Sequence, residues 1–262
     1  MSILLWPDGA PLAKGSEPAD CPAITPFLLE NSERPAPCML ICPGGGYQSI
    51  SVSEGEPIAA WLNGLGIAAV VLKYRVAPYH HPCPLMDVTR AMRLIRHHAG
   101  EWNIDPERIG VIGFSSGGHV ASTIGTHYDL GDPEAEDPIE RHSSRPSLMV
   151  LAYPRITMIH YPHPYHANLL GDDPTEELKS FLSNERHVTP DTPPVFMWIT
   201  GDDQNVHTGH LLLFASALTE HKVPYEMYIF ESGGHGLGLA RNHPTIRHWP
   251  ELCGIWLKKH GF

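Results

Sequence analysis

The sequence has few cysteines and few charged residues, and both shortages narrow the classes of protein that it can encode. Its 262 residues include five cysteines, an odd number, and no Cys-x-x-Cys pair, so neither a disulfide framework nor a redox dithiol is indicated. Charged residues make up only 18% of the chain, and 42% of the residues are hydrophobic. This balance argues against a disordered chain and is typical of a globular one.

Positive charge is scarce as well, with 18 lysines and arginines against 29 acidic residues and a net charge of −11. This deficit argues against nucleic-acid or anionic-membrane partners and favours a neutral small molecule. No hydrophobic run is long enough to span a bilayer, and the start, Met-Ser-Ile-Leu-Leu-Trp-Pro-Asp, lacks the pattern of a secretion signal. We therefore expect a cytoplasmic protein, and we leave open whether it forms a homo-oligomer.

Along most of the chain, short apolar runs alternate with stretches that show helix start and stop signals or helical periodicity. Continuous apolar runs are typical of parallel strands buried on both faces, so this alternation predicts one α/β domain, 1–262, with a mostly parallel central sheet and helices on both faces. We predict strands over 37–43, 67–74, 108–114, 148–153, 195–199 and 226–230. We predict helices over 56–62, 84–99, 117–127, 208–221 and 249–260.

The stretch 154–190 departs from this alternation, since it is rich in proline and histidine and has little periodicity. A long irregular insertion in a compact domain is more often a lid or the wall of a site than an ordinary loop. We predict a small cap insertion over the carboxyl edge of the sheet.

Gly-Phe-Ser-Ser-Gly at 113–117 fits the pattern G-x-S-x-G between a predicted strand and a predicted helix. In this context a strained turn lifts a serine hydroxyl clear of the sheet, and the flanking glycines remove side chains that would collide. The pattern therefore predicts that Ser115 is a nucleophile, although an ordinary glycine-rich turn is the simpler alternative.

A serine hydroxyl needs a basic histidine, and that histidine needs a carboxylate to orient it. His235 stands between glycines in the loop after the strand 226–230, and Gly-Asp-Asp at 201–203 follows the strand 195–199. We predict His235 as the base and Asp203 as the acid, with Asp202 as the alternative that would instead cap the turn.

The glycines at 44–46 follow the first predicted strand and offer bare backbone N–H groups where an oxyanion has to be bound. Ser116, the residue after the nucleophile, would supply a further N–H group. A phosphate-binding loop is the alternative for the triple glycine, but no Gly-Lys-Ser/Thr follows it and no G-x-G-x-x-G pattern is present.

The 18 histidines raise the question of a metal site, above all at His160, His163 and His166. Prolines at 162 and 164 prevent a helix from placing the three rings on one face, so the spacing supports no ligand geometry. We therefore expect no bound metal and interpret these residues as ordinary polar residues of the cap. For His119, one turn into the helix behind Ser115, we expect a structural hydrogen bond rather than catalysis.

Five motifs in order, Pro-Gly-Gly-Gly-Tyr (43–47), Tyr-Arg-Val-Ala-Pro (74–78), Gly-Phe-Ser-Ser-Gly-Gly-His (113–119), Gly-Asp-Asp (201–203) and Gly-Gly-His-Gly (233–236), carry a family resemblance. With them the chain resembles α/β-hydrolase esterases of the acetyl xylan esterase and feruloyl esterase-like (BD-FAE) group. The resemblance implies a Ser115–Asp203–His235 triad that cleaves a carboxylic ester through an acyl-enzyme without a cofactor. It also implies that the oxyanion donors include Gly45 and Gly46.

The sequence departs from related esterases at two places. Pro43 stands where hormone-sensitive-lipase-type esterases usually have histidine, and Asn-Val-His at 205–207 lacks the proline that many relatives have after the valine. The first departure removes a side-chain role from the glycine loop, and the second concerns the geometry of the acid's loop.

Members of the group are associated with removing acetyl groups from xylan and its oligosaccharides, so the resemblance implies a short-acyl esterase of xylo-oligosaccharides or related carbohydrates. Aromatic residues of 153–166, among them Tyr161 and Tyr165, suggest a sugar-sized pocket that binds by stacking. The alternatives are a general short-chain carboxylesterase, a serine peptidase with the same triad, and a non-catalytic scaffold on the same fold.

Overall fold

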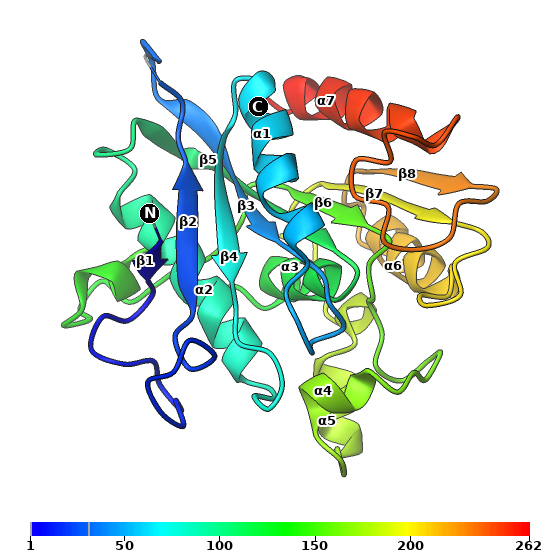
Figure 1. Cartoon of the computed structure of the whole chain (residues 1–262), viewed down its shortest axis with the longest axis horizontal. Helices are drawn as coiled ribbons and strands as arrows, with labels where there is room; N and C mark the ends of the chain where they lie inside the picture. Colours follow the sequence, from blue (N-terminus) through cyan, green and yellow to red (C-terminus); the bar gives the residue numbers. More distant parts are fainter. Residues whose placement is uncertain (1, 31) are drawn as a thin grey trace.

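A computed structural model of the chain describes residues 2–30 and 32–262 and contains one eight-stranded sheet (Figure 1). The strand order is β1-β2-β4-β3-β5-β6-β7-β8, and all pairings from β4 to β8 are parallel. The predicted α/β fold with a mostly parallel sheet is therefore confirmed. The strands are β1 (Ile3–Leu4), β2 (Ala23–Phe27), β3 (Ala36–Cys42), β4 (Ala68–Lys73), β5 (Ile104–Phe114), β6 (Met149–Ala152), β7 (Val195–Thr200) and β8 (Tyr225–Phe230).

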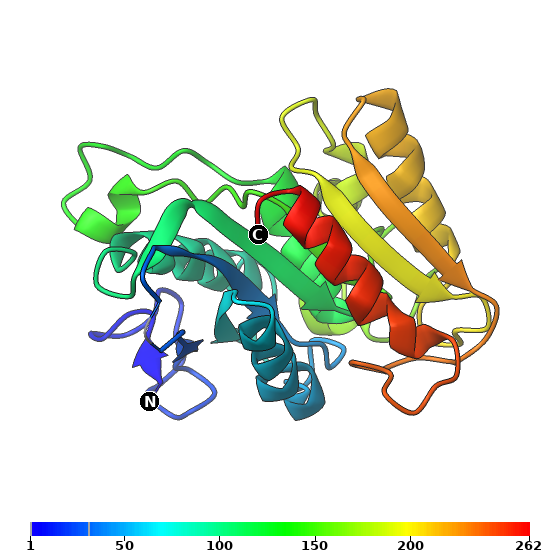
Figure 2. The ribbon, with the colours of Figure 1, turned by 90° about the horizontal axis from the view of Figure 1, so that it is seen from above.

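The helices cover the sheet on both faces. Seen from above, α1 and α7 lie on one face and α2, α3 and α6 on the other (Figure 2). An edge-to-face contact between Trp61 of α1 and Trp249 of α7, with ring centroids 5.3 Å apart, ties the first pair together. The helices are α1 (Glu56–Gly64), α2 (Cys83–His97), α3 (Ser116–Thr126), α4 (His166–Leu170), α5 (Glu176–Phe181), α6 (Gly209–Glu220) and α7 (Trp249–Lys259).

The central strands are buried on both faces, as their continuous apolar sequences predict. Every residue of β3, β6 and β7 is buried, whereas the edge strand β8 is partly exposed along most of its length. Because β3 and β5 to β8 all run in the same direction, their carboxyl ends meet at one edge of the sheet. Every sequence motif with predicted chemistry follows one of these strand ends.

Two antiparallel strands near the N-terminus were not among the predicted elements. β2 pairs with β4 and β1 pairs with β2. Pro26 interrupts β2, and a proline within a five-residue run normally argues against a strand because it has no N–H to donate. It is accommodated here because β1 pairs only with Ala23 and Ile24, so that at Pro26 β2 itself forms the edge of the described sheet.

The 154–190 segment contains helical structure that its sequence does not indicate. It includes α4, α5 and the short 3-10 helix η3 (Asn184–Arg186). Helices α4 and α5 lie apart from the main body of the sheet in Figure 1. Ser183 hydroxyl accepts a hydrogen bond from Met158 N–H, and Asn184 N–H donates to Ile156 carbonyl, so the two ends of the segment are joined.

Buried polar and thiol groups complete the core. Arg75 and Asp87 form a fully buried ion pair that holds the loop after β4 against α2. All five cysteines are free, and all but Cys21 are buried. Within residues 2–30 and 32–262, no helix is both long enough and apolar enough to cross a lipid bilayer.

Candidate active site

Ser115 occupies a strained turn between β5 and α3. Its φ is 54° and its ψ is −117°, a backbone conformation that non-glycine residues rarely adopt. A Cβ atom at Gly113 would lie 2.2 Å from Gly117 carbonyl oxygen, and one at Gly117 would lie 2.0 Å from Cys42 carbonyl oxygen. Any side chain at Gly113 or Gly117 would thus collide with the backbone, as the G-x-S-x-G pattern predicts.

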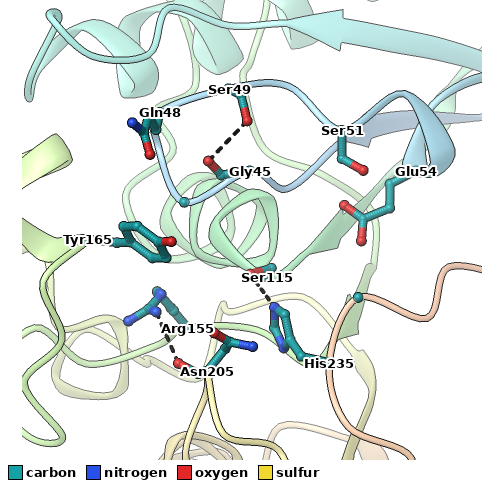
Figure 3. Close-up of a pocket in the computed structure, with 12 residues that line it drawn as sticks. Gly45, Gln48, Ser49, Ser51, Glu54, Ser115, Arg155, Tyr165, Asn205 and His235 are labelled. Carbon is teal, nitrogen blue, oxygen red and sulfur yellow. Dashed lines mark hydrogen bonds between the residues drawn. The ribbon is translucent and has the colours of Figure 1, made fainter.

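The structure brings Ser115, His235 and Asp203 together in one chain of hydrogen bonds. His235 Nε2 lies 2.8 Å from Ser115 Oγ (Figure 3). His235 Nδ1 lies 2.6 Å from Asp203 Oδ2. The Asp203 side chain is fully buried and the His235 side chain is 16% exposed. This arrangement has the connectivity of a nucleophile, a base and an orienting carboxylate.

The two adjacent aspartates have different hydrogen-bond partners. Asp203 Oδ1 accepts the N–H groups of Asn205 and Val206 at 2.8 and 2.9 Å, which leaves Oδ2 for the histidine. Asp202 Oδ1 instead accepts the N–H groups of Gly233 and Gly234, and these bonds lower the pKa of its carboxyl. The loop that carries Asp203 therefore holds this carboxylate with two backbone hydrogen bonds, although His207 stands where many relatives have proline.

The glycine loop after β3 lies beside Ser115. Gly45 has a φ of +132°, and a Cβ atom there would lie 2.0 Å from Ser49 carbonyl oxygen, so only glycine fits. Gly46 N–H donates to Ser116 Oγ at 2.9 Å, which joins this loop to the start of α3. Among the described residues, the N–H groups of Gly45 and Ser116 have no recorded protein acceptor.

A buried carboxylate supports both the glycine loop and the histidine. Glu54 Oε2 accepts Gly44 N–H at 2.8 Å, and its Oε1 accepts Tyr153 hydroxyl at 2.7 Å. The Tyr153 ring packs edge-on against the His235 ring at 4.9 Å, and burial beside Glu54 raises the pKa of its phenol well above the usual value. Glu54 thus positions elements on two sides of Ser115.

A pocket of about 340 Å³ opens over the Ser115 hydroxyl. Its wall contains hydroxyl, amide and charged groups and the ring of Tyr165, whereas Tyr161 stacks on the His207 ring at 4.2 Å and is not part of this wall. The lining residues are Gly45, Gly46, Gln48, Ser49, Ser51, Glu54, Ser115, Arg155, Tyr165, Asn205, His235 and Gly236 (Figure 3).

Arg155 is the cation of this pocket. Its side chain donates through Nη1 to His166 Nε2 at 3.1 Å and through Nη2 to Asn205 carbonyl at 3.0 Å. Burial lowers the pKa of its guanidinium to about 10, so it stays charged at neutral pH. Burial, and then the charge of Arg155, lower the pKa of His166 to about 4, so this imidazole is neutral and can accept the bond.

The remaining histidines singled out in the sequence lie outside the chain of hydrogen bonds at Ser115. His119 is buried, with Nδ1 2.6 Å from Tyr47 hydroxyl and Nε2 2.7 Å from Leu182 carbonyl, which is a structural arrangement. His166 is bonded to Arg155, a cation that opposes metal binding. Residues 2–30 and 32–262 contain no group of three or more histidine, cysteine or acidic side chains arranged to hold a metal ion.

Among the lining residues that sequence reasoning missed, two are charged, Glu54 and Arg155. Neither belongs to a motif that was singled out, and a lone glutamate or arginine carries no signal of burial. Arg155 had one available indication, because it follows the end of β6 at the same sheet edge as the other site residues.

An eight-stranded sheet of this order, with a serine turn after β5, an acid after β7 and a histidine after β8, defines an α/β hydrolase. The chain belongs to the BD-FAE family of esterases within this class, since the family model matches residues 27–218.

Two curated proteins have sequences similar to most of this chain. The chain is 39% identical over 223 residues to endo-1,4-beta-xylanase B of Butyrivibrio fibrisolvens, covering 82% of this chain and 34% of that protein. It is 31% identical over 239 residues to the acetylxylan esterase of Xylanibacter ruminicola, covering 88% and 47%. The chain therefore spans between a third and a half of the length of these curated relatives.

A solved structure matches the chain over nearly its whole length. The acetyl ester-xyloside bifunctional hydrolase from Caldicellulosiruptor lactoaceticus superimposes with a TM-score of 0.95 and 45% sequence identity, covering 100% of this chain and 97% of the other. The α/β-hydrolase fold and the esterase family therefore rest on sequence and on structure.

Proposed function

We propose that the chain is a serine esterase that removes acetyl or other short acyl groups from xylo-oligosaccharides or related carbohydrates. The observation that carries this proposal is the hydrogen-bonded series Ser115, His235 and Asp203 at the floor of a polar pocket. The hydroxyl and amide groups of the pocket wall suit a sugar, and the names of the xylanase, acetylxylan esterase and acetyl ester-xyloside hydrolase support a carbohydrate ester.

In the first half of the proposed reaction, His235 Nε2 accepts the proton of Ser115 Oγ as the oxygen attacks the ester carbonyl. Asp203 Oδ2 holds the Nδ1–H tautomer and stabilises the imidazolium that forms. The oxyanion lies against the N–H groups of Gly45 and Ser116, and Gly46 joins them when its N–H turns from Ser116 Oγ.

Collapse of the tetrahedral intermediate expels the sugar alcohol, which takes the proton from His235 Nε2 and leaves an acyl group on Ser115. A water molecule then gives a proton to His235 and attacks the acyl carbonyl, and a second collapse releases the acid and restores the serine. These steps use only residues of this chain.

The test is hydrolysis of p-nitrophenyl acetate beside acetylated xylo-oligosaccharides by the wild type, Ser115→Ala and Asp203→Asn. We expect the wild type to cleave both, Ser115→Ala to cleave neither while remaining folded, and Asp203→Asn to lose about ten-thousand-fold in kcat. Full activity of either variant would contradict the assigned roles.

The other outcomes separate the alternatives. Turnover of the aryl ester alone would favour a general short-chain carboxylesterase, and turnover of an aminoacyl p-nitroanilide would favour a peptidase. Absence of turnover and of labelling by a fluorophosphonate would favour a non-catalytic scaffold. The division into one domain with a 154–190 cap, the cytoplasmic location and the state of assembly stay predictions from the sequence.

A further inference from the structure

Arg155 is a buried cation whose side-chain hydrogen bonds, among the described residues, all go to neutral groups. The residue is 3% exposed, yet it forms no ion pair among the residues that the structure describes, whereas Arg75, which is equally buried, is paired with Asp87. Its two protein acceptors, His166 Nε2 and Asn205 carbonyl, are neutral. A buried charge that has no ion-pair partner in contact with it is unfavourable, so a buried arginine of this kind calls for an explanation.

The guanidinium also has donors left over. An arginine side chain carries five N–H groups, and two of them donate to His166 and Asn205. Nε is buried and has no hydrogen-bond partner. The remaining N–H groups of Nη1 and Nη2 belong to a side chain that lines the pocket over Ser115.

The position of Arg155 relates its charge to the reacting serine. Its backbone N–H donates to Ser115 carbonyl at 3.1 Å, so the residue is tied to the nucleophile turn. In Figure 3 the guanidinium lies beside Tyr165 and Asn205, and Glu54 lies on the opposite side of Ser115. Both oxygens of Glu54 already accept protein hydrogen bonds. Among the described residues, the pocket thus presents a cation with unused N–H groups on the Arg155 side and a carboxylate whose oxygens are already bonded on the Glu54 side.

We propose that Arg155 binds a carboxylate of the substrate, and that the preferred substrate is the acetyl ester of an acidic sugar, such as a xylo-oligosaccharide bearing a uronic acid. Carboxylate matches the paired N–H groups of a guanidinium better than a hydroxyl does. An acetyl group carries no charge, so the carboxylate has to be in the sugar part. This inference rests on the proposed function and adds the charge of the substrate to it.

A purely structural role makes a different prediction. If Arg155 only joined the cap to the loop of Asn205, its removal would lower the turnover of acidic and neutral substrates by the same factor. The charge of Asp203 also favours the charged form of Arg155, and the loss of that interaction would again be common to both substrates. The ratio of the two specificity constants therefore isolates carboxylate binding.

The experiment compares kcat/KM for a mono-acetylated glucuronosyl-xylose with kcat/KM for the same compound after reduction of its carboxyl to an alcohol. We expect the wild type to prefer the acidic compound by about tenfold or more, the effect of one charge-assisted hydrogen bond. Arg155→Gln should reduce this ratio to about one, and Arg155→Lys should give an intermediate ratio. Arg247→Gln, at an exposed arginine outside the pocket, should keep the wild-type ratio.

A second measurement needs no variant. Glucuronate and glucuronamide are compared as inhibitors of p-nitrophenyl acetate hydrolysis by the wild type, and we expect glucuronate to bind about tenfold more tightly or better. Equal inhibition, a wild-type ratio of one, or a preference that survives in Arg155→Gln would overturn the proposal. Hydrolysis of the aryl ester without release of acetate from either sugar would instead contradict the proposed function, and the inhibition result would still decide the role of Arg155.

Discussion

Asp202 and Asp203 are adjacent in the chain, and each holds one part of the histidine loop. Asp203 bonds the imidazole of His235, whereas Asp202 bonds the backbone N–H groups of Gly233 and Gly234 just before it. One carboxylate thus sets the ring's orientation and the other sets the path of the backbone that carries the ring. At the scale of single residues, side-chain direction decides which of two adjacent carboxylates bonds the imidazole.

Tyr161 and Tyr165 provide a matched pair for testing sugar binding. Tyr165 lines the pocket, while Tyr161 packs on His207 beyond it. We expect Tyr165→Ala to raise KM for an acetylated xylo-oligosaccharide about tenfold, because a stacking contact with the sugar ring is lost. Steady-state kinetics on sugar and aryl esters would measure this.

Tyr161→Ala is the control, since it removes the same ring from the same segment outside the pocket wall. It should leave KM for the sugar ester close to the wild-type value. An equal rise of KM in both variants would show that the effect comes from a general change in the cap and would argue against stacking on Tyr165.

The candidate site was partly predictable from sequence because three of its residues carry local signals. Ser115 lies in a steric motif, and the Asp203 and His235 loops follow apolar strands. Glu54 and Arg155 have no such signal, since their importance comes from burial and from partners about 100 and 50 residues away along the chain. Only the three-dimensional structure reveals that both oxygens of Glu54 accept hydrogen bonds and that Arg155 forms no ion pair with any residue that the structure describes.

At the scale of elements, the turn from β5 into α3 also determines where the neighbouring strand ends. Gly117, in the first turn of α3, approaches the carbonyl groups of Cys42 and Pro43 at the end of β3. The glycine loop that holds the proposed oxyanion donors begins at that point. The position of this loop therefore depends on how closely the helix packs against the end of β3.

Gly117→Ala tests this dependence. An added Cβ atom would lie 2.0 Å from Cys42 carbonyl oxygen, which is backbone and can move only with β3. We expect the free energy of unfolding to fall by about 1–3 kcal/mol because of overpacking. We also expect kcat at 25 °C to fall by a larger fraction of its wild-type value than the free energy of unfolding does. Urea denaturation and esterase assays on the same preparation would check both effects.

The control is Gly64→Ala in α1, where a Cβ atom meets nothing within 4 Å. That variant should be as stable as the wild type or more so, by about 0.5–1 kcal/mol, because alanine favours the helix. Unchanged activity and stability in Gly117→Ala would contradict the steric account of the turn.

The elements that sequence predicted well are the ones with a long apolar run or a clear helical period. The strands β3 to β8 and the five longer helices begin and end within a few residues of the expected positions. The pair β1 and β2 is short and contains Pro26, and α4 and α5 span five and six residues. Such short elements are stabilised by tertiary contacts rather than by local sequence preference, so sequence alone does not reveal them.

At the scale of the whole molecule, buried neutral histidines link the fold to pH. Burial lowers the pKa of His119 to about 3 and that of His210 to about 2. His210 Nδ1 accepts the N–H groups of Ile156 and Thr157, so it cannot take a proton without losing both bonds. The core is therefore built for uncharged imidazoles.

We predict that the free energy of unfolding falls as the pH drops below about 6.5. The unfolded chain binds protons at these histidines from about pH 6.5 downward, whereas the folded chain does so only near pH 3 and 2. The contribution of the two neutral imidazoles to the free energy of unfolding is thus fully present above about pH 6.5. At pH 5 each of the two histidines lowers the free energy of unfolding by about 2 kcal/mol. Urea denaturation at pH 7.5 and 5.0 measures the difference.

His210→Asn should lose less stability than the wild type between these two pH values, since an amide oxygen can accept the same N–H groups but does not titrate. His248→Asn, at an exposed histidine, should show the wild-type difference. An identical pH dependence in the wild type and in His210→Asn would contradict the assignment to His210.

The buried cysteines give the molecule an internal reporter of its own opening. Cys38 and Cys42 lie in the central strand β3, and burial raises the pKa of both thiols. An alkylating reagent reacts with the thiolate, so these two sulfurs become reactive only when β3 separates from its neighbours. The rate at which Cys38 and Cys42 are alkylated therefore measures how often the sheet opens at β3. Half-buried Cys21 reacts without this opening and provides the reference rate for the reagent.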